Sequence, residues 1–168
     1  MPTKQASLIE IPVSQRFQVL RVRIKKQQIN DFIEERYRER GRQYYEKGLV
    51  DIERIETAKI SAKCVGTHIY SVTLSSKKGR LFGECTCPAY EDFGPCKHLA
   101  AVAYAAISQQ NDSYSPSPAC LERLAEHQRL KDHLNGLSKS DLISLIMHLV
   151  EHDDELLWML VGDEDEFE

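Results

Sequence analysis

The chain lacks the long apolar runs of a membrane protein. None of its 168 residues lies in a stretch near the roughly 18–20 apolar residues that a spanning helix needs. The opening residues, Met1–Gln5, have no apolar stretch behind them, so no secretory signal is expected. In a chain that is not exported, the five cysteines stay reduced. These absences predict a protein of the cytoplasm, or of the nucleus in a eukaryote, with no membrane contact.

Enzyme signatures are also missing. The phosphate-binding loop Gly-x4-Gly-Lys-Ser/Thr is absent, which excludes an ATPase of that class. The zinc-enzyme patterns His-Glu-x-x-His and His-x-Glu with Pro-Cys-x-x-Cys are absent as well. No internal repeat is visible, which argues against solenoids and propellers. We therefore expect neither an enzyme nor a small-molecule substrate.

The net charge of −4 is distributed unevenly. Residues 1–48 carry 11 basic and 6 acidic residues, and residues 49–110 carry 7 and 6. Residues 111–168 carry only 4 basic and 14 acidic residues, a net charge of −10. Such asymmetry is typical of a chain with a nucleic-acid or protein partner, and a solvated acidic end gives the same numbers.

Periodicity predicts an α+β fold. Apolar or small residues recur every three or four positions over 28–47, which predicts a helix, and Gly48 is expected to end it. Alternation over 14–26 favours a strand. Residues 49–84 predict an antiparallel meander of three or four short strands with a hairpin tip at Lys77–Gly79. The alanine-rich run 97–107 predicts a buried helix.

The last third of the chain is interpreted as a linker and a helical appendage. We expect an N-terminal extension (1–27), a domain of helices and strands (28–108), a linker (109–118), an acidic helical region (119–162) and an acidic tail (163–168). Ser138 and Asp141 have the spacing of a helix cap. Cys120, beside the prolines of the linker, is a candidate for exposure. Trp158, the only tryptophan, is expected to fill a core.

The chemistry is concentrated in the pattern C-x-C-x8-C-x-H, formed by Cys85, Cys87, Cys96 and His98. Three thiolates and one imidazole make a complete tetrahedral shell for Zn²⁺. Cys85 and Cys87, at the end of a predicted strand, point to the same face. Cys96 and His98 converge only if Cys96 lies in a turn and His98 in the first turn of the next helix. Four protein ligands leave no place for a reactive water, so the pattern predicts one structural zinc ion.

This pattern, between a strand and a helix, resembles the SWIM-type zinc finger. The flanking segments Gly41–Val50 and Gly94–Ala100 are similar to those of bacterial members, and the resemblance covers residues 29–107. It implies a small antiparallel sheet with flanking helices around a zinc loop. It also implies a module that binds DNA or protein, with a helicase-like ATPase among the partners of such fingers, and no catalysis by the finger itself.

Two functional interpretations follow. In the first, the basic residues of the predicted helix contact nucleic acid; they are Arg36, Arg38, Arg40, Arg42 and Lys47. Those residues equally fit a solvated helix face paired with neighbouring glutamates. In the second, the chain is a protein–protein adaptor that uses its acidic C-terminal helices, and the zinc is purely structural. His148 and His152, four residues apart, are interpreted as ordinary surface histidines.

Overall fold

The computed structural model describes residues 24–161. Most of the predicted strand at 14–26 and the whole predicted tail at 163–168 therefore lie outside the described residues. The described end of that strand is wrong, because residues 24–25 are irregular and a helix begins at Lys26. The chain divides into two compact units, with the boundary between Leu124 and Ala125. We call them the sheet unit and the helical unit and describe each by itself. None of the helices in the described range is long and apolar enough to cross a membrane.

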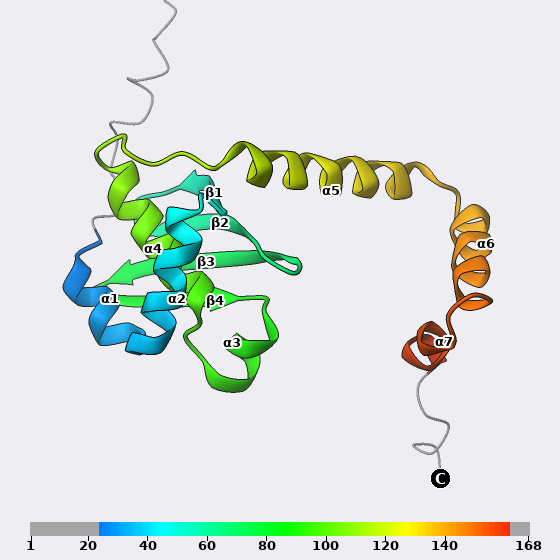
Figure 1. Cartoon of the computed structure of the whole chain (residues 1–168), viewed down its shortest axis with the longest axis horizontal. Helices are drawn as coiled ribbons and strands as arrows, with labels where there is room; N and C mark the ends of the chain where they lie inside the picture. Colours follow the sequence, from blue (N-terminus) through cyan, green and yellow to red (C-terminus); the bar gives the residue numbers. More distant parts are fainter. Residues whose placement is uncertain (1–23, 162–168) are drawn as a thin grey trace, which may run out of the picture. The chain divides into compact units, whose positions relative to one another are not determined.

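The sheet unit is a mixed α+β structure, as predicted (Figure 1). Its elements are α1 (Lys26–Phe32), α2 (Glu35–Glu46), β1 (Val50–Ile55), β2 (Lys59–Val65), β3 (Ile69–Lys77), β4 (Arg80–Cys85), α3 (Pro88–Phe93), α4 (Lys97–Gln109) and the start of α5 (Pro118–Gly136). The strands form one antiparallel sheet in the order β1-β2-β3-β4. Lys77 pairs with Arg80 across the predicted hairpin tip, where Lys78 and Gly79 have positive φ. The meander prediction is therefore confirmed.

One face of the sheet is apolar because side chains alternate along each strand. Paired residues on adjacent strands put their side chains on the same face, and these pairs are Val50 with Cys64, Ala62 with Val72, and Val72 with Cys85. All five side chains are buried. This face packs against α4. Because the strands pair in this register, the same buried apolar face extends to Cys85 at the end of β4.

Helix α4 lies in the centre of the unit. It contacts all four strands and also packs extensively against α2. A helix with neighbours on both sides must be apolar all round, and the alanine-rich sequence of α4 meets that need. Gly41 of α2 makes the closest approach: a Cβ atom there would lie 2.5 Å from Cβ of Ala100 and 2.6 Å from the carbonyl oxygen of Lys97. Because Gly41 and Ala100 are small, α2 and α4 approach each other closely beside the turn of α4 that contains His98.

The predicted helix over 28–47 is wrong in one respect, because it is two helices. Ile33 and Glu34 are extended and separate α1 from α2. The guanidinium of Arg38 donates hydrogen bonds to the carbonyl oxygens of Asn30 and Ile33, at 3.0 and 2.9 Å. These bonds satisfy carbonyl groups that the end of α1 leaves free. The break lets α1 pack against β4 while α2 packs against α4. Gly48 ends α2 with φ +65°, as predicted.

The segment after α4 is tied to the edge strand β1. The hydroxyl of Tyr114 donates to the carbonyl oxygen of Val50 at 2.7 Å and accepts from its amide at 3.1 Å. The Tyr114 ring stacks on Tyr45, and the amide of Ser117 donates to the carbonyl oxygen of Gly48. The chain therefore returns to the sheet before α5 begins. This return buries Cys120 completely, so the candidate exposure of Cys120 is wrong.

We expect Tyr114→Phe to lower the free energy of unfolding of the sheet unit by about 1–3 kcal/mol. The substitution keeps the ring stack but leaves a partly buried amide and carbonyl of Val50 without their partner. Chemical denaturation followed by circular dichroism measures the change. Tyr70→Phe removes a hydroxyl that has no hydrogen bond to any residue in the described range 24–161 and serves as the matched control. Equal stability of Tyr114→Phe and the wild type would contradict the role of this hydroxyl.

The helical unit comprises the rest of α5, α6 (Lys139–Val150) and α7 (Asp154–Val161). The predicted cap of α6 is confirmed: the hydroxyl of Ser138 accepts a hydrogen bond from the amide of Asp141. Helix α6 packs against α7. Trp158 is nevertheless 59% exposed, so the expectation that it fills a core is wrong.

Candidate metal centre

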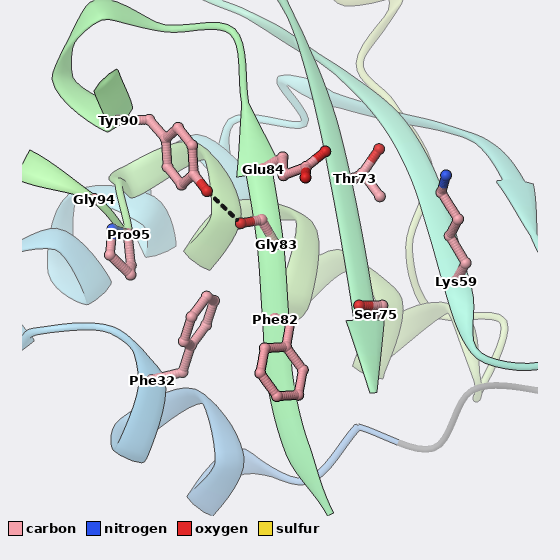
Figure 2. A pocket seen from close by; sticks show the side chains of 10 residues that line it. All are labelled: Phe32, Lys59, Thr73, Ser75, Phe82, Gly83, Glu84, Tyr90, Gly94 and Pro95. Atoms are coloured by element: carbon pink, nitrogen blue, oxygen red, sulfur yellow. Dashed lines mark hydrogen bonds between the residues drawn. The ribbon is translucent and has the colours of Figure 1, made fainter. Parts of the chain in front are cut away.

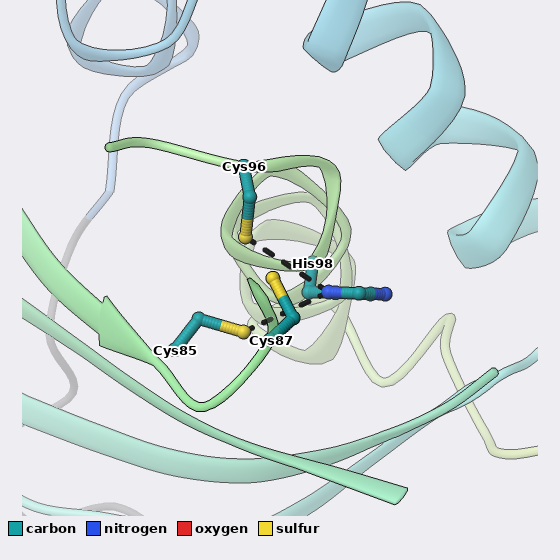
Figure 3. Close-up of side chains that lie close together, drawn as sticks. All are labelled: Cys85, Cys87, Cys96 and His98. Atoms are coloured by element: carbon teal, nitrogen blue, oxygen red, sulfur yellow. Dashed lines mark hydrogen bonds between the residues drawn. The ribbon is translucent and has the colours of Figure 1, made fainter. Parts of the chain in front are cut away.

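The four side chains of the C-x-C-x8-C-x-H pattern converge in the sheet unit (Figure 3). The three sulfur atoms and an imidazole nitrogen all lie within 4.8 Å of one another. All four residues are buried, and His98 is only 2% exposed. Two short segments, 85–87 and 96–98, thus deliver one compact set of donors.

Each donor is placed by the end of an element. Cys85 is the last residue of β4, and Cys87 is the N-cap of α3. Cys96 is the N-cap of α4 with extended backbone, and His98 lies in the first turn of that helix. The turn at Gly94, with φ +81°, connects the two halves. This is the arrangement that the two-residue spacing of Cys96 and His98 requires.

The distances fit a tetrahedral zinc ion. Nδ1 of His98 lies 3.6 Å from Sγ of Cys85 and 3.9 Å from Sγ of Cys96. A tetrahedron with Zn–S of about 2.3 Å and Zn–N of about 2.0–2.1 Å separates sulfur from nitrogen by about 3.6 Å. A disulfide is not formed, since all five cysteines are free thiols. The donor types and their separations therefore match Zn²⁺ bound through Nδ1 of His98.

The pKa values of the three thiols are shifted in different directions. A hydrogen bond with Cys85, followed by bonds from His98 and the amide of Leu99, lowers the pKa of Cys96 to about 4 although burial opposes the shift. The same bond and burial raise the pKa of Cys85. Burial, and then interaction with Cys96, raises the pKa of Cys87. A divalent cation removes this difference because it stabilises all three sulfurs as thiolates.

Two tyrosines fix the orientation of His98. The ring of Tyr70 stacks on the imidazole at 4.5 Å, and the ring of Tyr44 contacts it edge-on at 5.2 Å. Nε2 of His98 is buried and has no hydrogen-bond partner among the described residues. The imidazole is therefore held by aromatic packing, with Nδ1 turned toward the sulfurs. Tyr44 lies within the predicted helix 28–47, but that prediction did not indicate its contact with His98.

The loop between the cysteine pairs contains a helix that the sequence analysis missed. Pro88 opens α3 at a position where its missing amide costs nothing. The hydroxyl of Tyr90 donates to the carbonyl oxygen of Gly83 at 2.8 Å and ties α3 to β4 (Figure 2). An open hollow of about 550 Å³ lies beside this bond, between Phe32, Phe82 and Pro95. Its walls come from α1, β2, β3, β4, α3 and the turn before α4, and of these β4 and α3 also carry zinc ligands.

The proposed nucleic-acid residues do not form a uniform basic surface. Arg36 pairs with Glu34 at 3.0 Å, Arg38 is bonded to the end of α1, and Arg42 lies over the ring of Tyr104. Arg40 and Lys47 are exposed. The exposed positions of α2 also include three acidic residues, Glu35, Glu39 and Glu46.

Comparison with known protein families agrees with the donor set. Residues 70–107 match the model of the SWIM zinc finger. This segment is a SWIM zinc finger. The match begins in β3, ends in α4 and contains all four donors, and its Cys3His site is consistent with one structural zinc ion. SWIM fingers are binding modules rather than catalytic domains. No curated protein and no solved structure matches the chain.

Proposed function

We propose that the chain is a non-catalytic adaptor. Its SWIM zinc finger is a structural domain, and its helices α6 and α7 bind a protein partner. The observation that carries the proposal is the exposed apolar surface of these two helices. Nine large apolar side chains there are exposed, namely Ile143, Leu145, Ile146, Met147, Leu149, Leu157, Trp158, Met159 and Leu160. Monomeric proteins rarely leave so many large apolar side chains together in water, and such patches mark interaction sites.

The partner's chemistry follows from the charge around these helices. Residues 125–161 carry seven acidic and three basic side chains. A second copy of the chain would bring like charges together. A complementary partner presents apolar side chains rimmed by lysine or arginine. Trp158 is the kind of large aromatic residue that anchors such contacts.

The zinc centre supports a non-catalytic role. Catalytic zinc sites usually combine three protein ligands with an open position for water. Here four donors surround one point, and all are buried. When bound, the ion supplies cross-linking of β4, α3 and α4. The chain's own residues hold it: three cysteine sulfurs and Nδ1 of His98.

Nucleic acid is the competing partner, and the structure favours it less. Binding to phosphates needs several cations on one surface. Arg38 is committed to the end of α1, and Arg36 has an acidic neighbour at 3.0 Å. The glutamates on the same helix reduce the positive potential further. Arg40 and Lys47 are therefore the residues at which a reversal of charge tests nucleic-acid binding.

Affinity capture from the native cell, with and without nuclease, tests the proposal. We expect Ile146→Ser combined with Trp158→Ser to abolish capture of the main partner and Leu130→Ser, an equally exposed leucine on α5, to leave it unchanged. With the purified partner, the fluorescence of Trp158 should shift on binding. Zinc content must be the same in all variants. Capture that disappears with nuclease, or with Arg40→Glu and Lys47→Glu, would overturn the proposal in favour of nucleic acid.

A further inference from the structure

A second set of metal-binding side chains lies outside the zinc finger. His148, Glu151 and His152 are at the C-terminal end of α6 and in the turn that follows it. One nitrogen from each imidazole and a carboxylate oxygen lie within 4.8 Å of one another. The SWIM match ends at residue 107, so these residues belong to no part of the finger.

One of the two imidazoles is already oriented for metal binding. Nδ1 of His152 lies 2.8 Å from the carbonyl oxygen of His148, to which it donates a hydrogen bond. This bond fixes the tautomer and leaves the lone pair of Nε2 free. A histidine ligand in a metal site typically uses its second nitrogen in this way. The ring centroids of His148 and His152 are 4.6 Å apart, so one nitrogen of each ring can face the same ion.

The electrostatic environment favours a cation. The last carbonyl groups of a helix carry a partial negative charge. The site is at that end of α6, where the amides of Glu151 and His152 bond to the carbonyl oxygens of Met147 and Leu149. Asp153 adds a further carboxylate, which accepts a hydrogen bond from the amide of Glu155 at the start of α7. A bound ion would therefore neutralise charge at the turn between the two helices.

We propose that His148, Glu151 and His152 bind a divalent transition-metal ion of the Zn²⁺ and Ni²⁺ type. Two imidazoles and one carboxylate suit these ions, whereas Mg²⁺ and Ca²⁺ prefer oxygen ligands alone. The site differs from the finger in kind. Its three ligands are exposed, which leaves coordination positions for water or for a ligand from a partner. Binding links the end of α6 to the turn before α7 and thereby stiffens the connection between them.

Calorimetric titration of the full-length chain with Zn²⁺ tests this site. The protein is first brought to one equivalent of zinc, measured by mass spectrometry, so that the finger is filled. We expect one further equivalent to bind. His148→Ala and His152→Ala should each weaken this second event at least tenfold, because each removes an imidazole ligand. Glu151→Gln should weaken it less, since it keeps an oxygen but loses the charge.

His133→Ala, which removes an exposed histidine of α5, is the matched control and should leave the second event unchanged. The substituted positions are exposed, so the fold and the first equivalent of zinc should persist in every variant. A wild-type titration that stops at one equivalent in total would overturn the proposal. Equal weakening by His133→Ala would do the same. Neither result bears on the adaptor function, which rests on the apolar side chains.

Discussion

Replacing Cys87 with alanine is expected to release the zinc ion and unfold the sheet unit. The substitution leaves three ligands, and it opens a buried site to water between β4 and α4. In small finger peptides the apparent binding free energy of structural zinc is roughly 10–16 kcal/mol. The whole stability of a domain is about 5–15 kcal/mol. Even a fraction of the metal's contribution therefore decides whether this unit folds. His98→Ala should behave in the same way.

Thermal unfolding and zinc content together measure the effect. We expect Cys87→Ala to lose its stoichiometric zinc and its cooperative unfolding transition. Cys120→Ala is the matched control, because it removes another buried thiol that the metal does not need. It should lose about 1 kcal/mol or somewhat more, the cost of a small cavity, and keep its zinc. A Cys87→Ala protein that kept both the ion and its unfolding midpoint would contradict the structural role of zinc.

Gly41→Ala is expected to weaken both the fold and zinc retention, although Gly41 is not a metal ligand. Its new Cβ would lie 2.5 Å from Cβ of Ala100 and 2.6 Å from the carbonyl oxygen of Lys97, so α2 and α4 must separate. Overpacking of this kind costs about 1–3 kcal/mol. Lys97 lies between Cys96 and His98, so the displacement should also reach the metal centre. We therefore expect weaker zinc retention together with lower stability.

Competition with a zinc chelator, alongside chemical denaturation, measures both consequences of Gly41→Ala. Gly136→Ala provides the control, since nothing lies within 4 Å of a Cβ at that position at the end of α5. It should be neutral or stabilising, because alanine favours a helix over glycine by up to about 1 kcal/mol. Equal chelator resistance in Gly41→Ala and the wild type would show that the helix contact does not position the ligands.

The sheet and the metal pattern were predictable because both depend on the spacing of residues that are close together in the sequence. Alternation along β1 to β4 has a period of two, and the Lys77–Gly79 turn needs residues that tolerate positive φ. The pattern of Cys85, Cys87, Cys96 and His98 combines donor chemistry with fixed separations. None of these signals depends on which distant elements pack together.

The errors arise where tertiary contacts decide. The apolar stripe of residues 28–47 continues at helical spacing across Ile33, so periodicity did not register the break that Arg38 stabilises. Six residues of α3 are too few for a periodic signal. Cys120 is buried because Tyr114 and Ser117 bring the chain back to β1 and Gly48. No local pattern near Cys120 contains that information.

Trp158 was expected to be buried and is exposed, the reverse of the error at Cys120. Residue preference places a tryptophan in a core, but α6 and α7 alone offer too little surface to cover it. Its exposure, together with that of its neighbours, is the basis of the adaptor proposal. The orientation of His98 between Tyr44 and Tyr70 was equally inaccessible, since these tyrosines come from α2 and β3, elements that no local spacing relates to α4.

The most direct test of the zinc centre is X-ray absorption at the zinc edge. The His148→Ala and His152→Ala double variant should be used, so that only the finger contributes. Our account predicts one zinc per chain with three sulfur ligands at about 2.3 Å and one nitrogen ligand at about 2.0–2.1 Å. A chain purified without zinc, or a shell in which an oxygen replaces one of these donors, would contradict it.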